Sequence, residues 1–211
     1  MKYDYVLWDW NGTLLDDLDT ALACVNEMLC EINREPIDVE RYYSLIDTPI
    51  VNFYYGLFGT RDIDFDAISV QYHNAYSRRL PHTPLTAGAQ DILAYINAAG
   101  IKQLVVTSAN EQTVIEQLKA RGIYRYFADV LGAGDDYACS KIERAAQYFA
   151  ALPGARLLMV GDTLHDLETA RALGADCVLL TSGHQGRQIL AGADCIVKDR
   201  LGELVQILKE D

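Results

Sequence analysis

The first candidate for chemistry is an aspartate at the start of the chain. Asp9 ends an apolar run and is followed by Trp10, Asn11, Gly12 and Thr13. A carboxylate there can bind a cation or act as a nucleophile, while Gly12 permits a tight turn that brings backbone amides near an anion. Taken alone, an aspartate before an Asn-Gly pair is usually turn chemistry.

The second candidate is the segment GDTLHD, residues 161–166. Its aspartates Asp162 and Asp166 are four positions apart, so they share one face of a helix that begins here. Two like charges at that spacing destabilise a bare helix, although the helix dipole partly compensates near the N-terminus. A bound Mg²⁺ ion, which prefers hard carboxylate and carbonyl oxygens, would relieve the repulsion. The competing interpretation is that Asp162 only caps the helix.

Lys141 stands out because of its position. Ser140 and Glu143 form a capping box, which puts Lys141 in the first turn of the next helix. A positive charge there opposes the helix dipole. This placement suggests that the ammonium group has a partner elsewhere, such as a phosphate or a carboxylate at a strand end. An exposed lysine remains the alternative.

Two hydroxyl residues, Thr107 and Ser108, also end an apolar run. They precede Asn110, a good N-cap for a helix over residues 111–121 that closes with Gly122. Their hydroxyls and the following amides can hold an oxyanion at that helix N-terminus. On their own they fit a simple capping role.

The elements that must position these residues alternate along the chain. Six apolar runs have the length of strands and are mostly rich in Val and Leu. They cover residues 3–9, 102–108, 128–133, 156–162, 176–182 and 195–197. The segments between them from residue 100 onward fit helices, so we expect an α/β fold with a doubly wound, mostly parallel sheet. Ligands bind such sheets at the carboxyl ends of the strands, where these polar residues lie.

Residues 16–84 interrupt this alternation. Apolar residues recur from Leu18 to Ile32 at spacings of three and four, the stripe of an amphipathic helix. Three further segments fit helices better than strands: 38–47, 49–58 and 64–80. We therefore expect a core of residues 1–15 and 85–211, and a helical cap of residues 16–84 that overhangs the carboxyl edge of the sheet as a lid.

Charge and hydropathy narrow the possible partners. The formal net charge of −12 opposes nonspecific attraction to nucleic acid or to an anionic membrane. No apolar run approaches the ~18 residues of a membrane span, and no basic start precedes an apolar segment. We expect a cytoplasmic protein whose partners include neither nucleic acid nor membrane. The sequence does not predict an oligomeric state.

Together these segments resemble the haloacid dehalogenase-like hydrolase superfamily, and most closely its phosphoglycolate phosphatase-like branch. The matching segments are DWNGT at 9–13, VVTS at 105–108, Lys141 in SKIE, and VGDTLHDLETARALGA at 160–175. The resemblance spans essentially the whole chain, and the helical insertion matches the superfamily's cap in placement. It implies a Rossmann-like core and a phosphatase that acts on a small phosphorylated metabolite.

The resemblance also implies how the reaction runs. Asp9 would attack phosphorus and become an aspartyl phosphate. Thr107 and the amide of Ser108 would hold the phosphoryl oxygens, Lys141 would steady both nucleophile and phosphate, and the Gly12 turn would bring backbone amides near the anion.

The same resemblance implies a Mg²⁺ cofactor. Its ligands would be Asp9, the main-chain carbonyl of Asn11, and Asp162, with Asp166 acting directly or through water. The ion would neutralise charge while the reaction is divided into two displacements.

Asn11 departs from the pattern of these phosphatases. They usually have an aspartate there, which protonates the leaving oxygen and then deprotonates the attacking water. An amide can do neither, and this assistance is typically worth about 10²- to 10⁴-fold. Four explanations stay open: a slow phosphatase with another proton donor, such as the substrate, His165 or His184; a substrate with a good leaving group; a noncatalytic or regulatory phosphometabolite-binding protein; or a substituted or deamidated residue.

Overall fold

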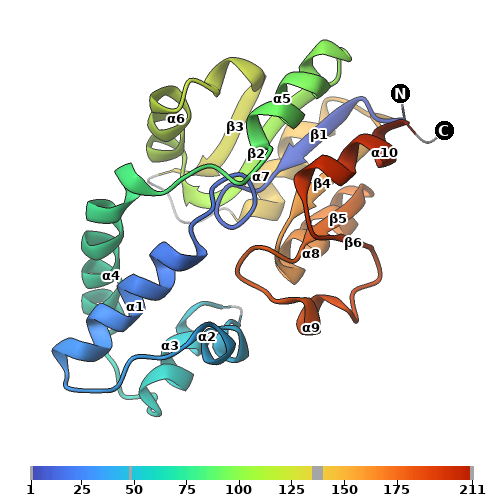
Figure 1. Cartoon of the computed structure of the whole chain (residues 1–211). Helices are drawn as coiled ribbons and strands as arrows, with labels where there is room; N and C mark the ends of the chain where they lie inside the picture. Colours follow the sequence, from blue (N-terminus) through green and yellow to red (C-terminus); the bar gives the residue numbers. More distant parts are fainter. Residues whose placement is uncertain (1, 48, 135–139, 210–211) are drawn as a thin grey trace. The chain divides into compact units, whose positions relative to one another are not determined.

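In a computed structural model of the chain, which describes residues 2–47, 49–134 and 140–209, six strands form one sheet (Figure 1). The strands are β1 (Tyr5–Trp8), β2 (Lys102–Asn110), β3 (Asp129–Ala133), β4 (Leu157–Gly161), β5 (Asp176–Leu180) and β6 (Ile196–Lys198). Their order is β3-β2-β1-β4-β5-β6, and every adjacent pair is parallel. This is the order of a doubly wound Rossmann-type sheet, so the predicted fold class is confirmed.

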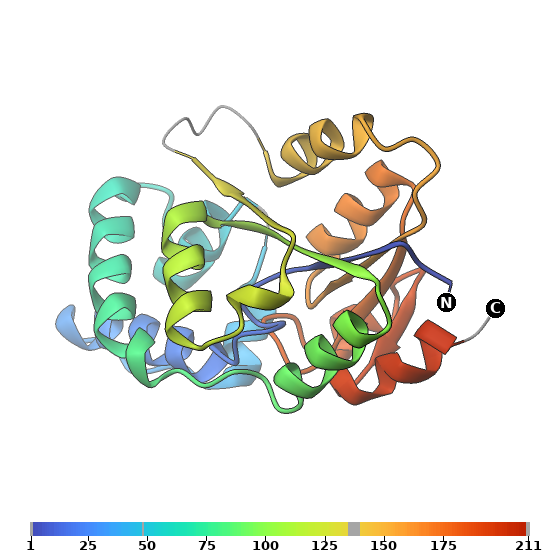
Figure 2. The ribbon, with the colours of Figure 1, turned by 90° about the horizontal axis from the view of Figure 1, so that it is seen from above.

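Helices cover both faces of this sheet (Figure 2). On one face lie α7 (Lys141–Ala150) and α8 (Leu164–Leu173); on the other lie α5 (Ala89–Ala98), α6 (Glu111–Ala120) and α10 (Leu204–Lys209). The short α9 (Arg187–Leu190) follows β5, and 3₁₀ helices cover Leu80–His82, Tyr124–Tyr126 and Leu201–Glu203. Every residue of β1 and β4 is buried, as expected for central strands between two helical layers.

Two fully buried tryptophans hold the chain on either side of Asp9. Trp8 donates its indole N–H to Gln103 Oε1 at 3.1 Å, and Trp10 donates to Gln117 Oε1 at 2.7 Å. A buried indole N–H needs such a partner, and the glutamines lie on β2 and α6. The backbone around Asp9 is therefore anchored to two neighbouring elements.

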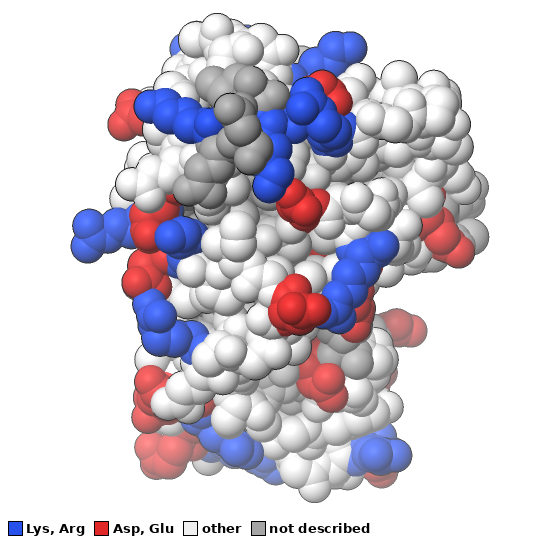
Figure 3. All heavy atoms as spheres, turned by 90° about the vertical axis from the view of Figure 1, so that its right-hand side faces the viewer, with Lys and Arg blue, Asp and Glu red and all other residues white. Residues whose placement is uncertain are grey.

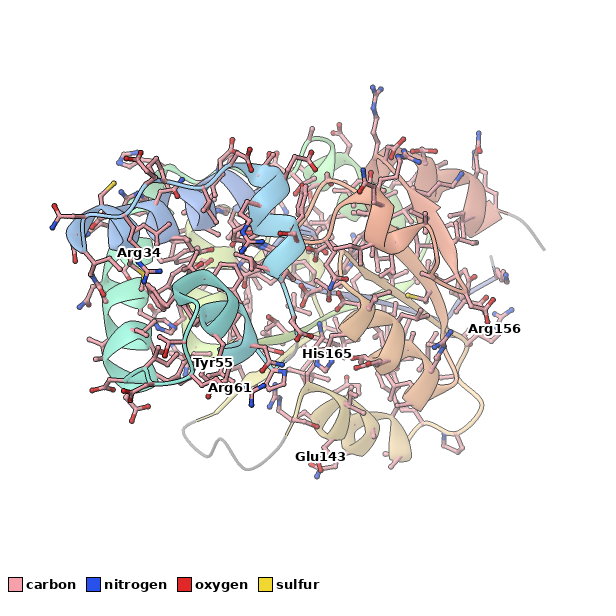
Figure 4. The ribbon with its side chains drawn as sticks, turned by 90° about the horizontal axis from the view of Figure 1, so that it is seen from below. Arg34, Tyr55, Arg61, Glu143, Arg156 and His165 are labelled. Atoms are coloured by element: carbon pink, nitrogen blue, oxygen red, sulfur yellow. The ribbon has the colours of Figure 1, made fainter. Side chains whose placement is uncertain are left out.

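The chain divides into two compact units, Met1–Leu15 with Leu85–Asp211, and Asp16–Pro84. The second unit contains α1 (Leu18–Glu31), α2 (Val39–Leu45), α3 (Val51–Phe58) and α4 (Phe65–Arg79). Its core is rich in aromatic rings: Phe53 lies 5.4 Å from Tyr42 and 5.2 Å from Tyr54, centroid to centroid. These tyrosines pack the helices of this unit together. Arg61 stacks over Tyr55 at 5.7 Å, and both are visible in Figure 4.

The surface carries charges of both signs. On the face that Figure 3 presents, Lys and Arg side chains are interspersed with Asp and Glu. Within the described ranges, no helix is both long enough and apolar enough to cross a membrane.

Candidate active site

Three buried carboxylates meet where the strand order changes direction. Asp9 follows β1, Asp162 follows β4, and Asp166 lies in the first turn of α8. One oxygen of each lies within 4.8 Å of the others, and the three residues are 9%, 0% and 1% exposed. The backbone explains the proximity, because Asp9 N donates to Val160 O at 2.9 Å and extends the β1–β4 pairing by one residue.

Lys141 lies between two of these carboxylates. Its ammonium group is 2.6 Å from Asp9 Oδ1 and 2.6 Å from Asp166 Oδ1. The predicted capping box of Ser140 and Glu143 is present and makes Lys141 the first residue of α7. Burial alone would lower the pKa of Lys141, but the two carboxylates outweigh it and hold that pKa above its usual value. The prediction that this ammonium group has a partner elsewhere is confirmed, with Asp9 at a strand end and Asp166 on α8, and the alternative of an exposed lysine was wrong.

Asp162 is fixed through both of its oxygens. Thr13 Oγ1 donates to Oδ1 at 2.9 Å, and His184 N donates to Oδ2 at 2.7 Å. Gly12 and Gly183 leave room for the carboxylate, because a Cβ on either would lie 2.2 Å from Oδ2. Glycine is therefore required at both positions by close approach.

Asp166 organises the start of α8. Its Oδ2 accepts hydrogen bonds from Asp162 N (3.2 Å), Thr163 N (3.0 Å) and Thr163 Oγ1 (2.8 Å), while Oδ1 faces Lys141. The N-cap is Thr163, so the interpretation of Asp162 as the capping residue was wrong. Burial raises the pKa of Asp166, but Lys141 and the Thr163 contacts overcome this effect and lower that pKa below its usual value.

The charge balance of the cluster favours a cation. Burial is the main cause that raises the pKa of Asp9 to about 6 and that of Asp162 to about 8. Within the described part of the chain, Lys141 is the one ammonium group in contact with this cluster of three carboxylates, and it contacts two of them, Asp9 and Asp166. An all-oxygen, net negative donor set suits a hard divalent ion such as Mg²⁺, so these residues fit the metal that the resemblance implies.

The last residues of β2 form a tight turn at the same edge of the sheet. Thr107 is 2% exposed, and its Oγ1 accepts a hydrogen bond from Ala109 N at 3.1 Å, while Ser108 is exposed. Asn110 caps α6 by accepting from Thr113 N at 3.0 Å, as predicted. Because β2 pairs with β1 in parallel, this turn and Asp9 lie at neighbouring strand ends.

Asn11 and the two histidines occupy different surroundings. Asn11 is half-buried in the turn where Gly12 adopts a φ of 73°. The His184 ring lies against that turn, since a Cβ on Gly12 would be 2.8 Å from His184 Cδ2. His165, labelled in Figure 4, instead lies 3.2 Å from Glu168 Oε2 on its own helix. The structure thus brings His184 to the Asn11 turn and pairs His165 within α8.

Sequence reasoning assigned no role to three residues that support the site. Thr13 lies in the DWNGT segment, and its hydroxyl could have been predicted to donate a hydrogen bond to a carboxylate of the site. Gln185 Oε1 accepts from Leu164 N at 2.7 Å at the start of α8, and Arg144 Nη2 donates to Thr107 O at 2.9 Å. Gln185 and Arg144 carry no local pattern that would have revealed these contacts.

Comparison with known proteins agrees with this arrangement. The Pseudomonas fluorescens protein named phosphoglycolate phosphatase is 29% identical over 213 residues, covering 95% of this chain and 78% of that protein. The structure of Protein Tyrosine Kinase A from Mycobacterium tuberculosis matches with a TM-score of 0.82 and 27% identity, over 99% of each chain. A predicted phosphatase from Clostridium acetobutylicum shares the fold, with a TM-score of 0.79 and 21% identity over 100% of both chains.

A family model also matches most of the chain. The model described as haloacid dehalogenase-like hydrolase aligns with residues 6–180, a range that includes most of β1, the helical unit and all three carboxylates of the cluster. Together with the strand order and the phosphoglycolate phosphatase relatives, this match shows that the chain belongs to the haloacid dehalogenase-like hydrolase family, in its phosphoglycolate phosphatase-like branch.

Proposed function

We propose that the protein is a Mg²⁺-dependent phosphatase of a small phosphorylated metabolite and that it acts through an aspartyl phosphate on Asp9. The observation that carries this proposal is the Lys141 ammonium group, 2.6 Å from both Asp9 and Asp166 at the carboxyl edge of the sheet. A nucleophilic carboxylate must be ionised and held in one orientation, and the contact to Oδ1 of Asp9 favours both. The relatives named phosphoglycolate phosphatase support the substrate class.

The reaction would proceed in two displacements. In the first, a carboxylate oxygen of Asp9 bonds to phosphorus while the bond from phosphorus to the metabolite oxygen breaks, and the released oxygen takes a proton. Thr107 and the amide of Ser108 hold the phosphoryl oxygens, and Lys141 offsets the negative charge that builds up between nucleophile and phosphate. In the second, water attacks phosphorus, phosphate leaves and the carboxylate is restored.

We assign the Mg²⁺ ligands to Asp9, the main-chain carbonyl of Asn11, and Asp162. When bound, such an ion would neutralise charge on the phosphoryl oxygens during transfer. Asp166 already accepts four hydrogen bonds, from Lys141, from Asp162 N and twice from Thr163. This supports contact through water, because its oxygens have little remaining capacity.

Asn11 determines how fast we expect the two displacements to be. Its amide cannot protonate the leaving oxygen or deprotonate water, so we expect both displacements to be slow and the aspartyl phosphate to persist. Residues 16–84 would act as a cap that excludes water and selects the metabolite, and residues 1–15 and 85–211 would form the catalytic core.

The proposal is tested by screening purified protein against a broad panel of phosphomonoesters with Mg²⁺. The matched control is Asp9→Asn, which keeps the size of the side chain and removes the nucleophilic charge. We expect hydrolysis that Asp9→Asn abolishes, together with a phosphoryl group on Asp9 that mass spectrometry detects in the wild type alone. Hydrolysis that survives in Asp9→Asn, or no hydrolysis at all, would overturn the proposal.

A noncatalytic or regulatory phosphometabolite-binding protein is the second candidate, and Asn11 is the observation that favours it. The similar Mycobacterium tuberculosis protein is named a tyrosine kinase, so proteins of this similarity are not all named phosphatases. Mg²⁺-dependent binding of a phosphometabolite without turnover would support this candidate. Robust multiple turnover would exclude it.

A further inference from the structure

Strand β2 leaves the regular ladder with β3 at the residues assigned to phosphate binding. It pairs with β3 at Val106–Leu131 and again at Asn110–Ala133. Residues 107–109 of β2 therefore lie opposite the single residue Gly132 of β3. Irregularities of this kind release backbone groups from the ladder, and they often lie beside functional sites.

Arg144 binds a carbonyl in this released segment. Its Nη2 donates to Thr107 O at 2.9 Å, across 37 positions of sequence and in a partly buried setting. A hydrogen bond from a charged donor is stronger than one from a neutral donor. The guanidinium therefore fixes the direction in which the Thr107 carbonyl points.

Arg144 and Lys141 reach the site from the same side of α7. They are three positions apart, so their side chains leave neighbouring points on the helix surface. Glu143 lies on the outer side of α7, where Figure 4 labels it, and accepts the capping hydrogen bond from Ser140 N. Two cations near a helix N-terminus oppose the helix dipole, so both positions need partners, and both have them at strand ends.

The Thr107 carbonyl matters because of the peptide bond that it shares with Ser108. This bond is planar and trans, so its C=O and N–H point in opposite directions. A guanidinium that holds Thr107 O on one side also aims Ser108 N–H to the other side. Hydrogen bonding to the carbonyl further polarises the peptide and strengthens the N–H as a donor.

We propose that Arg144 is a positioning residue that aims the Ser108 amide at the phosphoryl group; this inference rests on the proposed function of the same site. Arg144 acts through the peptide plane and does not itself touch the substrate. Lys141 orients the nucleophile, and Arg144 orients the amide that donates to the phosphoryl oxygens, so α7 aligns both groups for the reaction.

The test compares Arg144→Gln and Arg144→Lys with the wild type. Arg171→Gln on α8 is the matched control, because Arg171 is exposed and pairs with the exposed Asp194 across 3.8 Å. We expect orthophosphate, titrated calorimetrically with Mg²⁺, to bind roughly tenfold more weakly to Arg144→Gln, the equivalent of losing one charged hydrogen bond. Arg144→Lys should lie in between, and Arg171→Gln should bind as the wild type does.

Two further measurements separate positioning from a general loss of structure. Added guanidinium ion should restore phosphate binding to Arg144→Ala and leave the wild type unchanged. The Ser108 amide should exchange its hydrogen faster in Arg144→Gln than in the wild type without any ligand.

The outcomes distinguish this inference from the proposed function. If the wild type binds phosphate and Arg144→Gln binds it with the same affinity, the role of Arg144 is overturned and the proposed function stands. If the wild type binds no phosphate, the proposed function fails, and the Ser108 exchange rate then decides whether Arg144 orients the peptide: an unchanged rate overturns the inference.

Discussion

Replacing Lys141 by methionine removes an ammonium group from between two buried carboxylates and keeps the side chain nearly the same size. The lysine side chain is 2% exposed, and those of Asp166 and Asp9 are 1% and 12% exposed. Removing one partner of a buried ion pair leaves uncompensated charge and typically costs about 3–5 kcal/mol. Because whole domains are stable by only about 5–15 kcal/mol, this one change would remove a large part of the free energy of unfolding.

The assay is urea unfolding at neutral pH without divalent ions, with Lys119→Met as the control. Lys119 is exposed on α6 and lies over the Tyr124 ring, so its replacement should leave the unfolding midpoint within error. The loss in Lys141→Met should shrink as the pH falls. Without the ammonium group the folded-state pKa values of Asp9 and Asp166 rise, so the folded state binds more protons than the unfolded state and is favoured at lower pH.

The reasoning has two points at which it can fail. If Lys141→Met lowers the free energy of unfolding by less than about 1 kcal/mol, the Lys141 ion pairs are no stronger than exposed surface pairs, and the argument from burial is refuted. A loss that stays constant or grows as the pH falls would show that the carboxylates are not the source of the effect.

Three further predictions concern the metal and the proton. Asn11→Asp should raise turnover, by up to the roughly 10²- to 10⁴-fold that acid–base assistance supplies, in steady-state assays; an unchanged rate would mean that another group already transfers the proton. Thr13→Val should weaken Mg²⁺ binding about 10- to 100-fold by calorimetry, because Asp162 loses its 2.9 Å hydrogen bond from Thr13. Gly183→Ala should also weaken Mg²⁺ binding, because its Cβ would collide with the Asp162 carboxylate. The control Gly192→Ala, whose Cβ meets nothing within 4 Å, should leave Mg²⁺ binding unchanged. Burial raises the pKa of Asp162 to about 8, so protons compete with the ion and Mg²⁺ affinity should rise with pH up to about 8; an affinity independent of pH between 6 and 8 would contradict this.

The helices and strands were predictable because their signals are local. Buried strands require continuous apolar runs, and helices require apolar residues at spacings of three and four, whatever lies elsewhere in the chain. The predicted segments 38–47 and 64–80 contain the observed helices Val39–Leu45 and Phe65–Arg79. Capping boxes are equally local, which is why the start of α7 at Lys141 was predicted to the residue.

The contacts that support the site were less accessible to sequence reasoning. Asp162 had two local interpretations of similar weight, as a metal ligand and as a helix cap. The choice against capping depends on Thr163, which takes the N-cap position, and on Thr13, which is 149 positions away in sequence. A contact over that distance exists only because β4 pairs with β1, and strand order has no local signal.

The sequence by itself determined which residue types stand at the ends of which elements, because each element forms from short-range preferences and ends where the apolar run stops. Only the tertiary structure decided which of those ends meet. Parallel pairing of β1 with β2 and β4 brings Asp9, the Thr107 turn and Asp162 to one edge, and the irregularity in β2 releases the carbonyl that Arg144 binds. These contacts follow from packing and register, which depend on the whole sheet at once.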